Sequence, residues 1–312
     1  MYFPYFRGRQ YELLALRELA HGGLLGSHVI PVVEPLKITS TFSSAIKMFV
    51  DKNQPIALIV NPAVGDLAGS AADGSLAVGT MLPFISGSVI PSVIIGKDTT
   101  GVMSALNAKN MSSSGILAFI DNRDYIDTYQ EIFGVNPPKF ILLPDERLFR
   151  RAIIANKVMF EDKFKKQDKN ADYIKQEDEF FSDDHLYFSE EGFAGFGDYS
   201  VIGDEYIEGG FAPRAVAIHI VYFADDNSLR VYHFVSDSNS NTEDTAGKYY
   251  EAIIKLKKWY DARQSRQLTG ALSILLSHAE SGYYPGLPTI KKLSIMHHLE
   301  LLGKYLDGGL DK

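Results

Sequence analysis

The sequence predicts an α/β fold of the (β/α)₈ TIM-barrel type, with an added β-hairpin and C-terminal helices. Short apolar runs alternate with helix-like segments along the first two-thirds of the chain, which is the order of repeated βαβ units. Polar residues do not alternate within these runs, as expected for strands buried on both faces of a parallel sheet. About eight runs occur, the number that closes this barrel, and an open doubly wound sheet is the alternative.

The strand-like runs follow one another through residues 1–203. We expect strands at YFPYF, VIPVVEP, IALIVNP, VIPSVII, ILAFIDN, FILLPD, KVMFEDKF and FAGFGDYSVIG. Most of them precede a segment of helical composition, such as YELLALRELA after the first and ERLFRRAIIA after the sixth. The glycines of the last run suit a place where backbones approach closely. These features predict one barrel-like domain over residues 1–203.

The pattern is interrupted after the seventh run. Residues 163–179 (KFKKQDKNADYIKQEDE) are highly charged and carry few apolar side chains, so we predict a mobile, solvated lid loop. Residues 204–312 differ again, because AVAIHIVYF and LRVYHFVSD flank a polar turn and predict a β-hairpin. Two later segments have helical periodicity. We expect this C-terminal part to pack on the barrel.

Composition excludes several classes of protein. The 312 residues include no cysteine and carry a formal net charge of −8, so disulfides and thiolate chemistry are absent and direct binding of duplex DNA is not expected. No apolar run is long enough for a membrane span, and the first residues lack a signal-peptide pattern. No phosphate-loop or dinucleotide-binding motif occurs. We expect a soluble, cytoplasmic protein without a nucleotide cofactor.

Polar residues follow nearly every predicted strand. In a (β/α)₈ barrel the carboxyl ends of the strands converge on the face that holds the active site. Mg²⁺ and Mn²⁺ prefer oxygen ligands, so we predict a divalent-metal site formed by Glu34, Asp121, Asp162 and Asp198. The alternative is that each acid caps a helix or simply ends a strand at the surface, as the position of Asp145 before ERLFRR indicates.

A hydrolytic site follows from the same strand ends. The predicted catalytic residues are Asp162, His185 and Asp198. His185 follows two aspartates in SDDH, where an imidazole could accept a proton from metal-bound water. The predicted ligand-binding residues are Arg7, Asn61, Lys97, Asn170 and Tyr173. Among them, Arg7 and Lys97 would neutralise the charge of a phosphate.

Two histidines lie on the predicted hairpin. A hairpin could bring His219 close to His233, and imidazoles beside carboxylates can bind metal or act as a base. Each, however, is surrounded by apolar residues, where a hydrogen-bonded core histidine is commoner. We favour the structural interpretation for both, and also for His297 and His298.

Four motifs resemble those of the "beta protein" family of phages and bacteria, whose members are uncharacterised. They are RGRQYELLALREL, KNADY, EFFSDDH and GFAGFGDYSVIG, and the similarity extends from Tyr2 to about Asp237. The resemblance implies a mobile-element or phage-defence setting. It implies no particular reaction.

Two functions follow as hypotheses. The first is a barrel protein that binds a phosphorylated or nucleotide-like ligand at an acidic pocket with a divalent metal, and hydrolyses it. The second is a non-catalytic partner or immunity subunit of a defence complex, whose acidic surface binds a basic protein such as a nuclease. Acids at successive strand ends favour the first function, and the lack of a strict catalytic motif favours the second.

Overall fold

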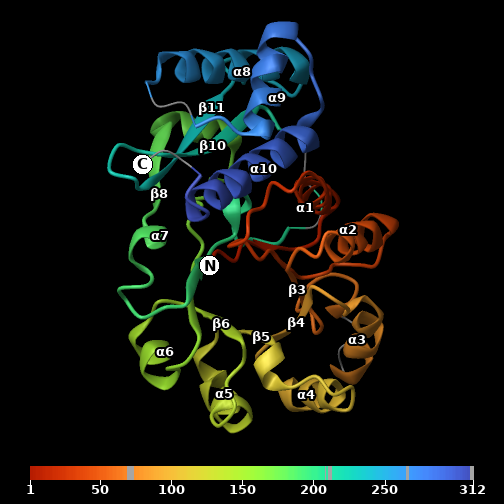
Figure 1. Cartoon of the computed structure of the whole chain (residues 1–312). Coiled ribbons are helices and arrows are strands. Elements are labelled where there is room, and N and C mark those ends of the chain that lie inside the picture. Colours follow the sequence, from red (N-terminus) through yellow and green to blue (C-terminus); the bar gives the residue numbers. More distant parts are fainter. Residues whose placement is uncertain (69–73, 208, 210–212, 265–266, 310–312) are drawn as a thin grey trace. The chain divides into compact units, whose positions relative to one another are not determined.

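The computed structural model describes residues 1–68, 74–207, 209, 213–264 and 267–309. The described chain divides into two compact units (Figure 1). Unit 1 comprises Met1–Glu161 and Asp184–Tyr199, and unit 2 comprises Asp162–Asp183 and Ser200–Lys312. This division differs from the domain boundary that we placed after residue 203, because residues 162–183 belong to the second unit.

An eight-stranded parallel sheet forms the described core of unit 1 and confirms the barrel-like (β/α)₈ fold. Its spatial order is β1 (Tyr5–Phe6), β2 (Val32–Val33), β3 (Ile56–Ile59), β4 (Val89–Ile94), β5 (Leu117–Phe119), β6 (Phe140–Leu143), β7 (Lys157–Phe160) and β9 (Gly195–Gly197). The two edges meet through a parallel bridge between Tyr2 and Phe196. A backbone hydrogen bond from Tyr5 N to Asp198 O adds to this contact. The sheet is therefore nearly closed.

Glycines allow this closure. A Cβ atom on Gly195 would lie 2.5 Å from the Met1 carbonyl oxygen, and one on Gly197 would lie 2.5 Å from that of Phe3. Side chains at these two positions would hold the last strand away from the first. The close backbone approach that the sequence predicts for this strand is confirmed.

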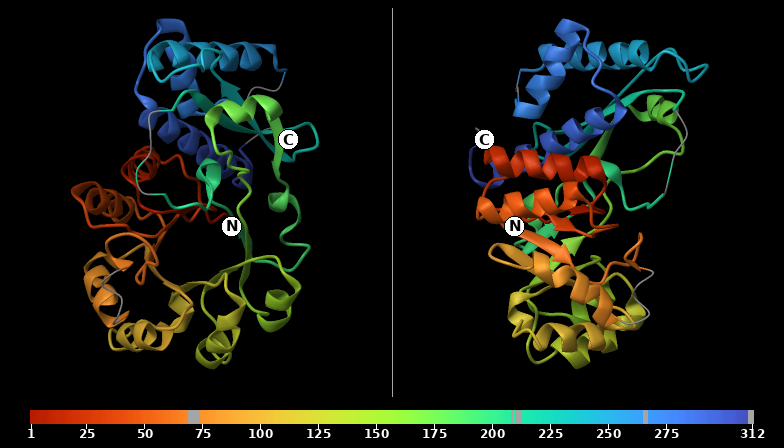
Figure 2. Two further views of the ribbon diagram at one scale, coloured as in Figure 1. Left: turned by 180° about the vertical axis from the view of Figure 1, so that it is seen from behind. Right: turned by 90° about the vertical axis from the view of Figure 1, so that its right-hand side faces the viewer.

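Helices lie outside the ring of strands in unit 1 (Figure 1). They are α1 (Gln10–Gly22), α2 (Ser40–Asp51), α3 (Gly74–Met81), α4 (Thr99–Asn107), α5 (Ile126–Phe133) and α6 (Arg147–Ala152), with short η2 (Leu82–Phe84), η3 (Ser113–Gly115), η4 (Arg123–Tyr125) and α7 (Asp184–Tyr187). Helix α1 buries Leu13, Leu16 and Leu19 on one face, as its spacing of three residues requires. The Thr39 hydroxyl accepts a hydrogen bond from Phe42 N and caps α2. Helices α1 and α2 lie side by side (Figure 2).

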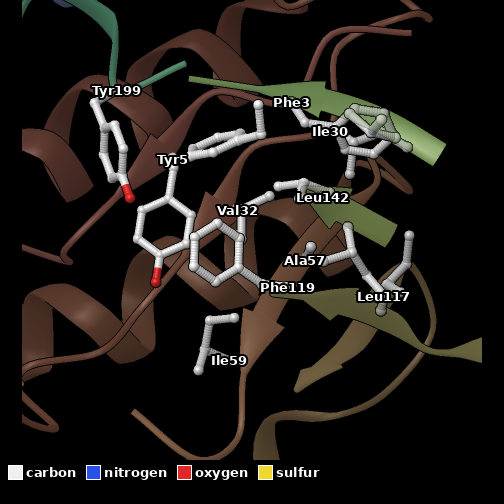
Figure 3. Packing of buried hydrophobic residues seen from close by; sticks show 13 residues of the cluster. Phe3, Tyr5, Ile30, Val32, Ala57, Ile59, Leu117, Phe119, Leu142 and Tyr199 are labelled. Atoms are coloured by element: carbon white, nitrogen blue, oxygen red, sulfur yellow. The ribbon is translucent and has the colours of Figure 1, made fainter. Parts of the chain in front are cut away.

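The interior of the barrel is filled with side chains. Tyr5, Phe119, Phe160 and Tyr199 form an aromatic layer in which the contacting ring centroids are 5.0 to 5.8 Å apart. Figure 3 shows several of these rings and the aliphatic side chains that pack with them from separate strands. The barrel therefore has a packed core, as expected for a parallel barrel of this size.

Unit 2 is built on an antiparallel sheet. In the described residues its three strands have the order β10 (Ala217–Phe223), β11 (Leu229–Val235) and β8 (Asp178–Ser182). The first two form the predicted hairpin, in which His219 pairs directly with His233. Helices α8 (Thr245–Ala262) and α10 (Leu287–Leu306) contact this hairpin, α9 (Gly270–Ser281) packs against both, and η6 (Ser200–Ile202) contacts α10. Across the described ranges, no helix combines the length and apolar character needed to cross a membrane.

The predicted lid, residues 163–179, has regular structure. It contains the 3₁₀ helix η5 (Asn170–Gln176) and the start of β8. Phe164, Tyr173 and Glu179 are each at most 5% exposed, and η5 contacts β10 and β11. Two aromatic side chains are thus enough to anchor a segment whose composition resembles a solvated loop. The segment covers one face of the sheet in unit 2.

Candidate functional site

Glu34 at the end of β2 is engaged in the structure of the barrel. Its side chain is 2% exposed and accepts hydrogen bonds from the Tyr5 hydroxyl at 2.9 Å and from Ala63 N at 2.7 Å. Arg7 Nε lies 3.5 Å from the same carboxylate. Burial and the negative charge of Glu34 raise the pKa of Tyr5 well above its ordinary value, so the phenol remains a donor. Glu34 and Arg7 therefore complete a structural network at this strand end.

Asp198 after β9 has a similar role. Its side chain is 2% exposed and accepts a hydrogen bond from the Tyr2 hydroxyl at 2.8 Å. Tyr2 stacks on Phe196 with ring centroids 5.1 Å apart, and neither ring belongs to the interior cluster. Because alternate residues of a strand share a face, Asp198 lies with Phe196 on the outer side of β9. Its carboxylate does not point into the barrel.

The other predicted residues of unit 1 are dispersed. Asn61 bonds the backbone of Ile94 through both ends of its amide, at 2.8 and 2.9 Å, which joins the ends of β3 and β4. Lys97 and Asp121 are exposed. His185 is 5% exposed, with its ring centroid 6.3 Å from that of Phe196.

Asp162 belongs to unit 2. It accepts hydrogen bonds from Phe164 N at 3.0 Å and Asp204 N at 2.9 Å. Loss of solvent, and secondarily the Asp204 carboxylate, raise the pKa of Asp162. In the part of the chain that the structure describes, no three His, Asp or Glu side chains come close enough together to hold a metal ion. The four predicted metal ligands are not brought together as such a group.

A cavity of about 260 Å³ lies within unit 2. The segment before η5, η5 itself, β10 and α10 all contribute to its lining, which includes Phe164, Lys166, Asn170, Tyr173, His219, Lys291 and Ser294. Two predicted ligand-binding residues, Asn170 and Tyr173, are therefore in one pocket. Lys166 and Lys291 supply positive charge, and no described residue of the lining is acidic.

A chain of hydrogen-bonding groups leads to this cavity across the sheet. The Nδ1 atoms of His219 and His233 are 2.7 Å apart. On the far side of His233, Nε2 lies 3.1 Å from Glu179 Oε1, and Lys165 Nζ is 3.5 Å from Glu179 Oε2. Glu179 and His233 are 4% and 0% exposed, so the hydrogen bonds from Glu179 through His233 to His219 are shielded from solvent.

The direction of each hydrogen bond follows from the chemistry of the groups. An ionised Glu179 can only accept, so His233 Nε2–H donates to it. Burial lowers the pKa of His233, and burial followed by the charges of His233 and Lys291 lowers the pKa of His219 well below 6.5. With both rings neutral, His233 Nδ1 accepts from His219 Nδ1–H. His219 Nε2 therefore carries a lone pair.

Aromatic rings cover the histidine pair. The Tyr173 ring centroid is 4.7 Å from that of His219 and 4.4 Å from that of His233, and the Phe164 centroid is 5.1 Å from that of His219. The Tyr173 hydroxyl accepts a hydrogen bond from Gln167 N at 3.1 Å. Burial raises the pKa of Tyr173, so this hydroxyl keeps its proton and can donate to a ligand.

Sequence reasoning found only part of this site. It placed His219 near His233 but favoured a purely structural role, and it did not single out Lys166, Lys291 or Glu179. The equal spacing of the two histidines from the hairpin turn was a usable signal, because it makes them direct partners. The approach of Glu179, 54 residues from His233, had no local signal.

The chain matches no protein-family model, no curated protein and no solved structure. The resemblance to beta proteins, with its phage-defence setting, therefore stays a prediction from motifs.

Proposed function

We propose that unit 2 binds a small phosphorylated or nucleotide-like ligand in the pocket lined by Lys166, Tyr173, His219 and Lys291. The observation that carries this proposal is the charge of the lining, which contains two lysines and no described acidic residue in a chain of net charge −8. Charge-assisted hydrogen bonds to phosphate oxygens are stronger than neutral ones. A partly enclosed pocket also weakens competition from water.

Both lysines of the pocket can bind a phosphate group. Lys166 pairs with Glu205 at 2.7 Å, but the two side chains are 36% and 56% exposed, and exposed pairs contribute little stability. A phosphate could therefore replace Glu205 as its partner. Lys291 on α10 is close enough to His219 for its charge to lower the pKa of that histidine. An anion beside Lys291 would offset this positive charge.

The uncharged part of the pocket lining can contact an organic portion of the ligand. Phe164, Tyr173, Ile202 and Ile290 give the pocket apolar surface, and rings of this kind can contact a base or a sugar. A volume of about 260 Å³ is slightly smaller than the usual range for ligand sites, which begins at about 300 Å³. The pocket therefore suits a mononucleotide or a sugar phosphate better than a dinucleotide.

Isothermal titration calorimetry with inorganic phosphate, adenosine 5′-monophosphate and adenosine tests this proposal. We expect both phosphate-containing probes to bind and adenosine to bind more weakly than its monophosphate. Lys291→Met should weaken phosphate binding at least ~10-fold, because it removes a charged donor while keeping an unbranched chain. Lys292→Met is the matched control, since Lys292 directly follows Lys291 in α10 and does not line the pocket.

Two results would overturn the proposal. One is the absence of binding by both phosphate probes, and the other is equal affinity in the Lys291 and Lys292 variants. Either result would favour the non-catalytic partner of a basic protein, a role that an acidic chain also suits.

A further inference from the structure

We propose that His219 is a general base in this pocket and that unit 2 hydrolyses a phosphate ester of its ligand. This inference rests on the proposed function, because His219 can act only on a molecule that the pocket holds. His233 and Glu179 are positioning residues that hold the ring of His219 and set its tautomer.

The polar atom that faces the ligand is His219 Nε2. His219 lines the cavity, and its Nδ1 is occupied by His233 at 2.7 Å. Within the described ranges, no residue is hydrogen-bonded to the Nε2 atom of His219. Since Nδ1 is used in the sheet, Nε2 is the ring nitrogen left for a ligand or a water molecule. Its lone pair can accept a proton.

A structural histidine in the same unit provides the contrast. His297 is 1% exposed, and both of its nitrogens are bonded within the protein, Nδ1 to the Thr269 hydroxyl and Nε2 to the Val221 carbonyl oxygen, each at 2.8 Å. Such a ring has no bonding capacity left for a ligand. His219 differs because only one of its nitrogens is held and because it borders a cavity. A core role alone does not account for this arrangement.

Burial, and after it the charges nearby, keep His219 neutral near pH 7. The titratable groups that face it or its partner are His233 from β11, Lys291 from α10, Lys166 from the segment before η5, Tyr173 from η5, and Glu179 and Asp178 from β8. The positive charges of the lysines disfavour protonation of His219. The Glu179 carboxylate would favour it, but the neutral ring of His233 separates Glu179 from His219. The base form is thus present at neutral pH and is lost only as the pH falls through the depressed pKa of His219, which lies well below 6.5.

The reaction balances with water alone. With p-nitrophenyl phosphate as the probe, a water molecule gives a proton to His219 Nε2 while its oxygen forms a bond to phosphorus. The bond between phosphorus and the phenolic oxygen breaks, and p-nitrophenolate leaves with the electron pair. His219 then releases the proton to solvent. Lys166 and Lys291 would stabilise the charge on the phosphoryl oxygens during this transfer.

The decisive experiment compares hydrolysis of p-nitrophenyl phosphate with calorimetric binding of inorganic phosphate. His219→Gln should lower kcat/KM by ~100-fold or more, while phosphate binding falls far less. In the wild type, kcat/KM should stay constant through pH 6.5 and decrease only at pH values well below it, where Nε2 of His219 becomes protonated. His28→Gln, at an exposed position of unit 1, is the matched control and should leave hydrolysis unchanged.

Glu179→Gln tests the positioning role. A glutamine amide can donate to His233 Nε2 and so reverse both tautomers, which places the proton on His219 Nε2. We expect hydrolysis to fall in this variant while phosphate affinity holds or increases, since Nε2–H can donate to the anion. Loss of packing alone would lower both quantities together. Thermal melts of each variant show whether it is folded.

Phosphate binding and phosphate-ester hydrolysis are measured separately, so either can be absent without the other. If the wild type binds phosphate but does not hydrolyse p-nitrophenyl phosphate, or if His219→Gln hydrolyses it like the wild type, the general base is wrong and the binding proposal stands. Absent phosphate binding overturns both. Long-range ¹H–¹⁵N NMR on the wild type adds a test without any variant, because a protonated His219 Nε2 at pH 7 would also overturn the general base.

Discussion

The strand ends of the barrel and the sheet of unit 2 both carry buried polar groups, but these groups are bonded differently. Glu34 and Asp198 accept hydrogen bonds from tyrosines of the same barrel, and Glu34 also receives a backbone N–H. In unit 2, the chain from Glu179 through His233 ends at His219, which lines a cavity. One set of groups has its partners inside the fold, and the other ends at a residue that lines a cavity.

Position in a fold is therefore a weaker guide to a site than the hydrogen-bonding capacity that a buried side chain has left. A buried carboxylate with two donors loses those bonds if it turns to a ligand, and each donor left behind has its own desolvation cost. A neutral histidine held by one nitrogen keeps the other for chemistry without breaking anything. The acids at the barrel strand ends were reasonable candidates by location. Judged by the hydrogen-bonding capacity that is left, the histidine pair is the better candidate for a functional site.

The largest expected effect concerns the barrel. Glu34→Ala removes the acceptor of the Tyr5 hydroxyl and of Ala63 N and leaves Arg7 without this carboxylate, so it should destabilise by about 3–5 kcal/mol. The urea midpoint measures this change. Asp121→Ala at an exposed strand end is the control and should change the free energy of unfolding by less than about 0.5 kcal/mol. An unchanged midpoint for the Glu34 variant would contradict the structural role of Glu34, and with it the difference between the barrel strand ends and the sheet of unit 2.

Acid should destabilise unit 2 through its neutral histidines. Burial lowers the pKa of His297 to about 4, below its ordinary value in an unfolded chain. Because the folded pKa is depressed, the stabilisation is present above pH 6.5 and is lost as the pH falls toward 4, which amounts to about 3 kcal/mol. Urea unfolding of the wild type and His297→Gln at pH 7 and pH 4.5 measures it. The pH-dependent loss should be smaller in the variant, and equal losses would contradict the assignment.

A smaller effect is expected from one hydroxyl in the pocket. Tyr173→Phe keeps the ring against the histidines but removes the hydroxyl that Gln167 N bonds. If this hydroxyl donates to the bound anion, phosphate affinity should fall by about 5–10-fold. Tyr250→Phe, at a half-exposed position on α8, should bind phosphate like the wild type. Identical affinities of the two variants would remove Tyr173 from the ligand site.

The smallest expected effect is the response to divalent metal. Glu34 and Asp198 are engaged by tyrosines, and the described residues contain no group of three potential ligands. Saturating Mg²⁺ or Mn²⁺ should therefore leave the Tm unchanged relative to a monovalent salt of equal ionic strength, because only a ligand of the native state raises it. A rise that disappears in Asp198→Asn or Asp162→Asn would support the metal site predicted from the strand ends.

Much of the fold was determined by the sequence itself. Apolar runs without alternation, each followed by a helical segment, indicate a parallel sheet because only buried strands of βαβ units need both features. The glycines of β9 and the hairpin register of His219 with His233 were also readable. These properties depend on residues near one another in the chain, where periodicity and turn chemistry act.

Which polar groups remain available for a ligand depends on contacts between distant parts of the sequence. The partner of Asp198 is Tyr2, 196 residues away, and the partner of His233 is Glu179 from a segment that looked like a solvated loop. A local pattern cannot register such pairings, because burial and hydrogen-bond satisfaction are properties of side chains that the fold brings together. The sequence therefore determined the barrel and the hairpin, whereas packing decided that the barrel acids are bonded within the fold and that His219 faces a cavity.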